Sequence, residues 1–113
     1  MKAINVKAIE GQTVYGGNLM VKPMMMGDEM TIMEITYTPG VGAPMHKHAH
    51  ESIVYVVKGK VKTVIEGDGE YVLGPGDVCR HPAGLMHTVE ALEDAVMIEI
   101  KAPAADFMNF FKV

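Results

Sequence analysis

Cys79 is the only cysteine in this chain of 113 residues, so no disulfide can form within it. A lone cysteine is typical of proteins that fold in a reducing compartment. No apolar segment approaches the ~20 residues that a membrane-spanning helix needs. The first residues also lack the apolar core of a signal peptide. These absences predict a cytoplasmic protein that does not enter a membrane.

Positive charge is scarce as well. Arg80 is the only arginine, the lysines form no run, and the formal net charge is -4 at pH 7. Nucleic acids and anionic membrane surfaces attract proteins through clustered positive charge. We therefore expect neither nucleic acid nor membrane among the partners of this protein, and a small molecule instead.

The sequence shows no sustained helical periodicity. Short runs rich in β-branched and aromatic residues alternate with turns rich in glycine and proline. A chain of 113 residues, 49% of them hydrophobic, suits one domain with a substantial core. The pattern predicts a single all-β domain over residues 1–113, either a barrel or a sandwich.

The strands can be placed from these runs and turns. Pro23 is expected to end an early strand, and Gly59 is expected to turn a hairpin. In the strand over residues 30–38, alternate positions share one face. We expect strands at residues 2–9, 19–22, 30–38, 52–57, 61–65, 70–73, 78–81, 87–91 and 95–101. Glycine-rich residues 16–18 are expected to turn, and the tail, residues 102–113, suits a short helix or an extended segment.

Three of the five histidines stand at alternate positions in one short stretch: His46, His48 and His50. On a β-strand, residues two apart point to the same face, so these imidazoles would share one side. Neutral ring nitrogens are borderline-soft donors that suit a divalent transition metal. The cluster therefore predicts a metal site.

Two motifs in the chain resemble those of the cupin superfamily. In the first, Gly40 is followed after five residues by His-x-His, and Gly59 closes the motif. In the second, Gly76 is followed after five residues by Pro-x-Gly, and then after two residues by His87. The resemblance covers residues 31–101. It implies a double-stranded β-helix, the jelly-roll barrel of the cupins, assembled as a homodimer.

The resemblance also implies a metal site inside the barrel. The two histidines of the first motif and the histidine of the second bind one metal in this family. Carried over to this chain, these residues are His46, His48 and His87. The implied cofactor is one divalent transition metal ion per chain: zinc, iron, nickel, manganese or copper.

The family's fourth ligand follows the histidine pair, and in the most similar subgroup this position falls on Ser52. A protonated serine hydroxyl is a poor metal ligand, so His50, Glu51 or a water molecule are alternatives for the fourth position. Strand parity directs Glu51 to the opposite face. His50 is expected to line the pocket rather than to bind the metal. A second departure is Ala91, where the second motif normally ends in asparagine.

The other chemically capable residues have structural interpretations. We expect His81 at a strand end, Cys79 as an inert core thiol, and Arg80 on a solvated strand edge rather than clamping a substrate carboxylate. Tyr37 and Tyr55 are expected to pack in the core, and Met45 and Met86, each beside a predicted ligand, are expected to wall the pocket.

Three histidine ligands leave coordination positions open for substrate, which suits Lewis-acid chemistry or oxygen activation. The first motif and the ending Ala-Pro-Ala-Ala-Asp-Phe are similar to those of small cupins that process unsaturated uronates. This similarity implies a metal-dependent isomerase or lyase that opens or isomerises a small polar or acidic, sugar-acid-like molecule. Two alternatives stay open: a three-histidine iron dioxygenase acting on a chelating molecule, and a non-catalytic, metal-containing ligand-binding barrel.

Overall fold

The computed structural model describes residues 2–14, 19–40 and 42–104. Within these ranges it contains ten strands and one short 3-10 helix, and none of its helices has the length and apolar character to cross a membrane. The elements are η1 (Val6–Ala8), β1 (Gln12–Val14), β2 (Leu19–Met26), β3 (Thr31–Tyr37), β4 (Gly42–His46), β5 (Glu51–Lys58), β6 (Val61–Ile65), β7 (Gly69–Leu73), β8 (Val78–His81), β9 (His87–Ala91) and β10 (Ala95–Ala102). The predicted all-β class is confirmed.

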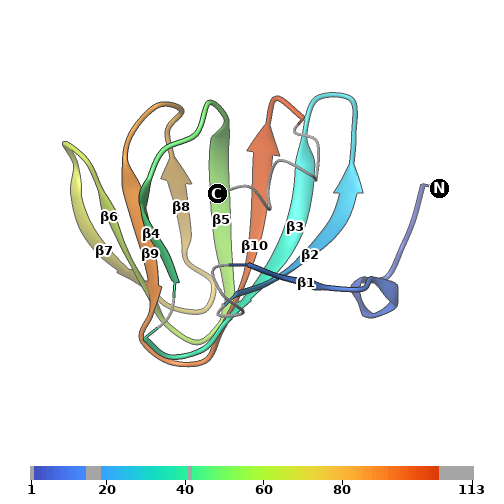
Figure 1. The fold of residues 1–113 in the computed structure, drawn as a ribbon, viewed down its shortest axis with the longest axis horizontal. Helices are drawn as coiled ribbons and strands as arrows, with labels where there is room; N and C mark the ends of the chain where they lie inside the picture. Colours follow the sequence, from blue (N-terminus) through green and yellow to red (C-terminus); the bar gives the residue numbers. More distant parts are fainter. Residues whose placement is uncertain (1, 15–18, 41, 105–113) are drawn as a thin grey trace.

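The strands form two antiparallel sheets that face each other (Figure 1). One has six strands in the order β1-β2-β3-β10-β5-β8, and the other has four in the order β4-β9-β6-β7. Neighbours along the chain, such as β4 and β5 or β9 and β10, therefore lie in different sheets. This repeated crossing between two sheets is the jelly-roll arrangement that the cupin motifs imply.

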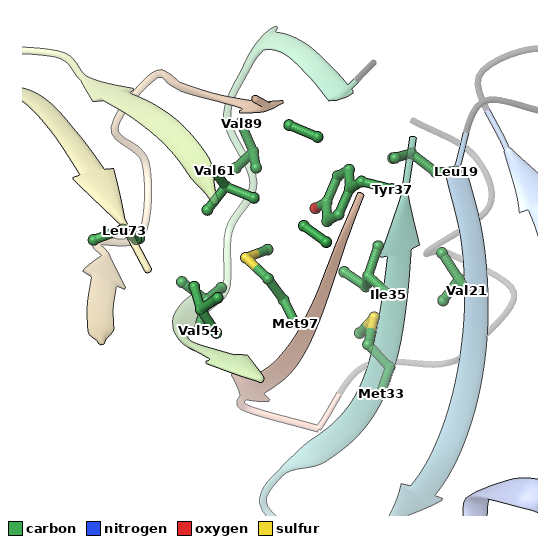
Figure 2. Close-up of a cluster of buried hydrophobic side chains, with 13 residues drawn as sticks. Leu19, Val21, Met33, Ile35, Tyr37, Val54, Val61, Leu73, Val89 and Met97 are labelled. Atoms are coloured by element: carbon green, nitrogen blue, oxygen red, sulfur yellow. The ribbon is translucent and has the colours of Figure 1, made fainter. Parts of the chain in front are cut away.

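Inward-facing side chains of both sheets make the core. The alternation predicted for β3 is confirmed, because Thr31, Met33, Ile35 and Tyr37 are all buried. Figure 2 shows that side chains of both sheets meet in the space between them. Each fully buried aliphatic side chain stabilises the fold by about 1.5–3 kcal/mol. The buried cluster comprises Leu19, Val21, Met33, Ile35, Tyr37, Val54, Val56, Val61, Leu73, Val89, Ala91, Ala95 and Met97.

The hairpin predicted around Gly59 is wrong. β5 pairs with β10 and β8, whereas β6 pairs with β7 and β9 in the other sheet. Gly59 has a φ of +82°, and a Cβ at this position would lie 2.0 Å from the backbone oxygen of Asp94. This glycine therefore lets the chain pass from one sheet to the other where the backbone of Asp94 leaves no room for a side chain. A glycine with positive φ is also typical of hairpin turns, which is why the local sequence could not distinguish the two.

The strand predicted for residues 2–9 is also wrong. Residues 6–8 form the short helix η1, which Asn5 caps by accepting a hydrogen bond at Oδ1 from the backbone of Lys7 at 2.8 Å. None of the residues in η1 is buried. The alternation in this segment was weak, so the local cap decides its conformation.

β2 does not end at Pro23, as the sequence predicted, but continues to Met26. Its pairing with β3 shifts register between Pro23 and Met25, and β1 accompanies β2 only as far as Val21. The proline therefore lies at a bulge beyond the end of β1, where a missing N–H is tolerated. The turn predicted at residues 16–18 and residues 105–113 of the tail lie outside the described residues.

Candidate metal centre

Strand pairing brings His46 and His87 together. β4 and β9 are antiparallel, and their register places His46 directly opposite His87. The two ring centroids are 4.4 Å apart. His46 is the last residue of β4 and His87 is the first of β9, so both rings lie at the same end of the four-stranded sheet.

His48 reaches the same point from the loop between β4 and β5, so the predicted alternation along one strand does not place it. The backbone N–H of Gly84 donates to the carbonyl of His48 at 2.9 Å, which ties this loop to the Pro-x-Gly turn of the second motif. Gly84 has a φ of +77°, a conformation that favours glycine. The ring of His48 lies 5.8 Å from that of His46 and 5.1 Å from that of His87, centroid to centroid.

A backbone carbonyl contacts the Nδ1 atom of each of these three rings. The distances are 2.6 Å from Pro44 to His46, 2.8 Å from His50 to His48, and 3.2 Å from Leu85 to His87. Because a carbonyl only accepts, each neutral ring carries its proton on Nδ1 and its lone pair on Nε2. This is the tautomer in which Nε2 binds a metal while the backbone orients the ring.

The three rings offer one nitrogen each, and these nitrogens all lie within 4.8 Å of one another. Burial is the main cause that lowers the pKa of His48 and of His87 to about 4. Both rings are therefore neutral near pH 7 and keep their lone pairs available. In the part of the chain that the structure describes, this is the one such group of three, and its donor set fits a divalent transition metal.

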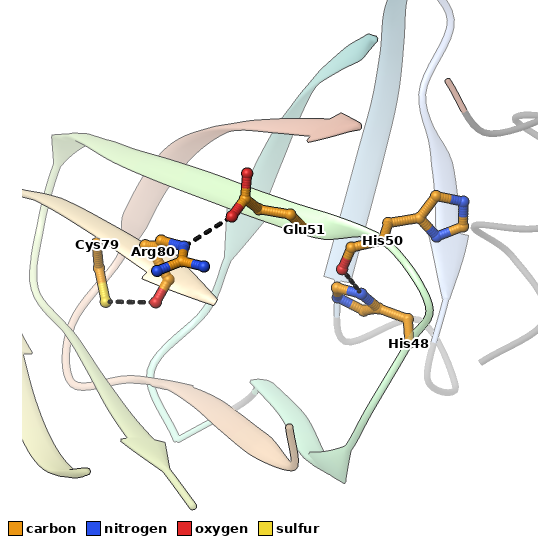
Figure 3. A network of polar contacts seen from close by, with 5 residues as sticks. All are labelled: His48, His50, Glu51, Cys79 and Arg80. Carbon is orange, nitrogen blue, oxygen red and sulfur yellow. Dashed lines mark hydrogen bonds and ion pairs between the residues drawn. The ribbon is translucent and has the colours of Figure 1, made fainter. Parts of the chain in front are cut away.

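His50 and Glu51 do not join this group. Figure 3 shows that Nδ1 of His48 is hydrogen-bonded to the carbonyl of His50 and not to its ring, and the two ring centroids are 6.1 Å apart. Glu51 lies on the outer face, as its parity predicts, with Oε2 2.7 Å from Nε of Arg80. Both side chains of this pair are largely exposed, so Arg80 is the solvated strand-edge charge that we expected. Cys79 is half-buried, and burial raises the pKa of its thiol, which leaves it unreactive.

Ser52, at the family's fourth ligand position, faces the interior and is 1% exposed. Its Oγ is buried without a hydrogen-bond partner. Its cross-strand neighbours are His81 on β8 and Lys101 on β10. Leaving a buried hydroxyl unsatisfied costs about 1–3 kcal/mol. Ser52 therefore adds an uncompensated polar atom to the interior, which a bound ligand could satisfy.

His81 belongs to the site, although the sequence predicted only a strand-end residue. It is 1% exposed, and its ring stacks on that of His87 with centroids 4.2 Å apart and planes 8° apart. Its Nε2 lies 2.9 Å from Oγ1 of Thr63, which donates its own proton to the carbonyl of Thr88 at 2.6 Å. Nε2 of His81 must therefore be the donor to Thr63. Burial lowers the pKa of His81 to about 3, so its ring is neutral near pH 7. By stacking on His87, this ring holds the plane of the His87 imidazole.

The histidines open into a cavity of about 60 Å³ between the sheets, large enough for a few water molecules. Tyr37 lines this cavity and packs in the core, as predicted. Met45 and Met86 do not line it, so the prediction that they wall the pocket is wrong, and so is the prediction that Tyr55 packs in the core. Tyr55 and Met45 are instead nearly half exposed. The apolar walls come from β1, β2, β3, β4 and β9: Val14, Leu19, Val21, Met33, Ile35, Tyr37, Ala43 and Val89.

Two charged residues that the sequence interpretation missed also line the cavity. Glu99 and Lys101 follow Met97 at alternate positions of β10 and share its inward face. Their side chains are only 13% and 12% exposed, and Nζ of Lys101 lies 3.5 Å from Oε2 of Glu99. The sequence could have indicated their position. They lie two and four residues after Met97, and residues at alternate positions of a strand share one face, here the face toward the interior.

Comparison with known proteins identifies the family. Residues 33–101, more than half of the chain, match the model of the cupin domain family. This protein therefore belongs to the cupins.

Three known proteins are similar to this chain. The solved structure of KdgF from Halomonas sp. is 29% identical, covers 93% of this chain and 96% of its own, and superposes with a TM-score of 0.83. Dimethylsulfoniopropionate lyase DddQ of Ruegeria pomeroyi is 33% identical over 64 residues, which are 56% of this chain and 32% of that protein. Oxalate decarboxylase OxdC of Bacillus subtilis is 24% identical over 84 residues, 71% of this chain and 22% of that protein. The chain thus spans less than a third of either curated relative.

Proposed function

We propose that this cupin binds one divalent transition metal through His46, His48 and His87 and catalyses a reaction of a small carboxylic acid there. The observation that carries the proposal is the convergence of three imidazole rings, each with its Nδ1 atom contacting a backbone carbonyl. When bound, such a metal polarises a substrate oxygen as a Lewis acid. Three protein ligands leave coordination positions for that oxygen.

The surrounding residues hold this arrangement and limit access of water. His81 stacks on His87 and is itself anchored by Thr63, so the ring of His87 has little freedom to rotate. Tyr37 and Val89, both buried, belong to the apolar wall of the cavity. A site whose ligands are oriented in advance and whose walls exclude water strengthens every electrostatic interaction with the substrate.

We infer that the reaction is ring opening or isomerisation of a sugar-acid-like molecule. The similarity of the motifs to those of uronate-processing cupins supports this choice. KdgF supports it by its size, since the two chains match over nearly their whole lengths. The names of the curated relatives specify small carboxylates, dimethylsulfoniopropionate and oxalate, as the compounds on which those proteins act.

A second candidate is a three-histidine iron dioxygenase that acts on a chelating molecule. Ser52 favours it, because this buried serine stands where a fourth ligand is expected. With three histidines as the metal-binding group among the described residues, a chelating substrate and oxygen would both have room.

We also propose that the single domain of residues 1–113 forms a homodimer and that the protein is cytoplasmic. Strand pairing places Ile53, Tyr55, Val78 and Ile100 next to one another on the outer face of the six-stranded sheet, where all are exposed. A contiguous exposed apolar patch marks an interaction surface. Light scattering should give twice the chain mass for the wild type and the single mass for Tyr55→Lys; a monomeric wild type would contradict the dimer.

The decisive experiment begins with elemental analysis of the protein as purified, followed by two assays on the metal-loaded form. Loss of ultraviolet absorbance by an unsaturated uronate without oxygen supports the isomerase. Oxygen consumption with a chelating substrate supports the dioxygenase instead. Tight binding of small acids with no turnover in either assay would point to the ligand-binding barrel. A protein that neither retains nor accepts a divalent metal would contradict the proposal as a whole.

A further inference from the structure

The inner row of β10 changes character along its length. Ala95 and Met97 are fully buried in the core, and the next two inward positions are Glu99 and Lys101. Lys101 pairs across β10 with Thr31 on one side and Ser52 on the other, both of which are buried and polar. The interior is therefore polar on the side where these residues share the cavity with the histidines.

Fold stability does not explain a charged pair at this place. Taking an ammonium and a carboxylate out of water is costly, and apolar residues of similar size are often equally good or better for stability. The neighbouring inward residues of β10 and β5, Met97 and Val54, show that apolar side chains fit this surface. The charges of Glu99 and Lys101 therefore point to a ligand rather than to the core.

Both charges act on the histidines with which they share the cavity. Burial and then the charge of Lys101 lower the pKa of His48. For His87, burial dominates, and the charge of Glu99 acts in the opposite direction. Because the two charges cancel and imidazoles bind a metal in their neutral form, a divalent ion would leave the cavity with a net positive charge that favours anions.

We propose that Lys101 is the residue that recognises a carboxylate of the ligand, with Glu99 as its counter-charge when no ligand is bound. The separation of 3.5 Å between Lys101 and Glu99 is longer than the ~2.7–2.9 Å of a strong charge-assisted hydrogen bond, so a ligand carboxylate can improve on it. An ammonium has three donors and can contact Glu99 and the ligand together. The ligand class is a small acid with a hydroxyl or carbonyl oxygen near its carboxylate. That second oxygen would bind the metal, and this half of the inference rests on the proposed function.

The test compares two pairs of probes that differ only in charge: D-galacturonate with D-galactose, and glycolate with ethylene glycol. Binding is measured by calorimetry on the zinc-loaded protein and again after removal of zinc by a chelator. We expect at least one acid to bind the wild type about tenfold or more tightly than its neutral partner, as a charge-assisted hydrogen bond would give. Lys101→Met should abolish that preference in the zinc-free protein and reduce it in the zinc-loaded protein, where the charge of the metal still attracts anions, and Lys101→Arg should keep more of it.

Two further variants control for damage to the fold. Lys62→Met removes a lysine of the outer pair Lys62–Glu70 and should leave the preference unchanged. Glu99→Gln removes the counter-charge from Lys101 and should tighten binding of the acid several-fold, an effect that unfolding cannot produce.

The possible failures are separable by zinc content. A preference that depends on Lys101 in a protein that binds no zinc would refute the metal proposal and keep this one. Equal binding of acids and neutral partners by a zinc-loaded wild type would refute the role of Lys101 and keep the metal site. Loss of zinc in Lys101→Met or in Glu99→Gln would also overturn the inference, since it would assign these residues to metal binding.

Discussion

The space between the two sheets has an apolar end and a polar end, and the same strands build both. Along β5, Val56 and Val54 are buried against the core, and the next inward residue is Ser52. β10 makes the same change after Met97, where Glu99 and Lys101 follow. The apolar end stabilises the fold through burial. The polar end contains a buried ion pair, an unsatisfied hydroxyl and neutral imidazoles, which together oppose folding and suit a binding site.

The largest expected effect concerns the polar end alone. His46→Ala combined with His87→Ala removes two of three proposed ligands, and we expect the apparent metal-binding free energy to fall by on the order of 5 kcal/mol or more. Elemental analysis and metal titration measure this loss. His50→Ala is the matched control and should retain metal. Full occupancy in the double variant would refute the site.

A cavity at the apolar end should reduce stability without affecting metal binding. Met97 is completely buried, and Met97→Ala should lower the free energy of unfolding by about 2–5 kcal/mol, as measured by urea denaturation. Ile98, its outward neighbour on β10, is only half-buried, and Ile98→Ala should cost clearly less. Equal losses in the two variants would mean that the inner and outer faces do not differ as the structure indicates.

Acid should destabilise the metal-free protein through the polar end. The folded-state pKa values of His48 and His87 are about 4 and that of His81 is about 3, all below the unfolded value of 6.5. The unfolded chain therefore binds more protons in this window, so stability is fully present above pH 6.5 and declines as the pH falls toward 4. Urea midpoints at a series of pH values measure the slope. His81→Phe should reduce it by about one proton; an unchanged slope would exclude His81 as a contributor.

Ser52→Glu tests whether position 52 faces the metal. A carboxylate there adds a charged donor, and we expect metal affinity to rise about tenfold, while the metal-free protein becomes less stable because a charge is buried. Metal competition with a chromogenic chelator gives the affinity. Unchanged or weaker binding would show that this position does not reach the metal.

The smallest effect on stability is expected when the buried charged pair of Glu99 and Lys101 is replaced by apolar side chains. Glu99→Leu combined with Lys101→Met should change the free energy of unfolding by less than about 1 kcal/mol, or raise it, because a buried ion pair contributes little net stability. Urea denaturation of this double variant, set beside Met97→Ala, measures the contrast between the two ends directly. A loss as large as that of Met97→Ala would show that the pair is structural.

Much of the fold could be predicted because strand alternation and turn chemistry are local. The strands Val78–His81 and His87–Ala91 have the predicted bounds, and the buried face of Thr31–Tyr37 is the predicted one. The errors occur where a distant partner decides. Gly59 has the sequence of a hairpin turn, yet its close approach to Asp94 makes it a corner between sheets. Pro23 was expected to end a strand, but a bulge accommodates it.

The sequence by itself determined that the chain is an all-β cupin and which histidines its motifs contain. Only the tertiary structure decided how they meet: His46 opposite His87 by strand register, and His48 from a loop held by Gly84. It also revealed the histidine that stacks behind the site and the ion pair within it. Alternation along a strand is a property of the local backbone, whereas register and packing depend on contacts between residues far apart in the chain. The sequence therefore identifies the candidate donor residues, whereas their geometry depends on the tertiary structure.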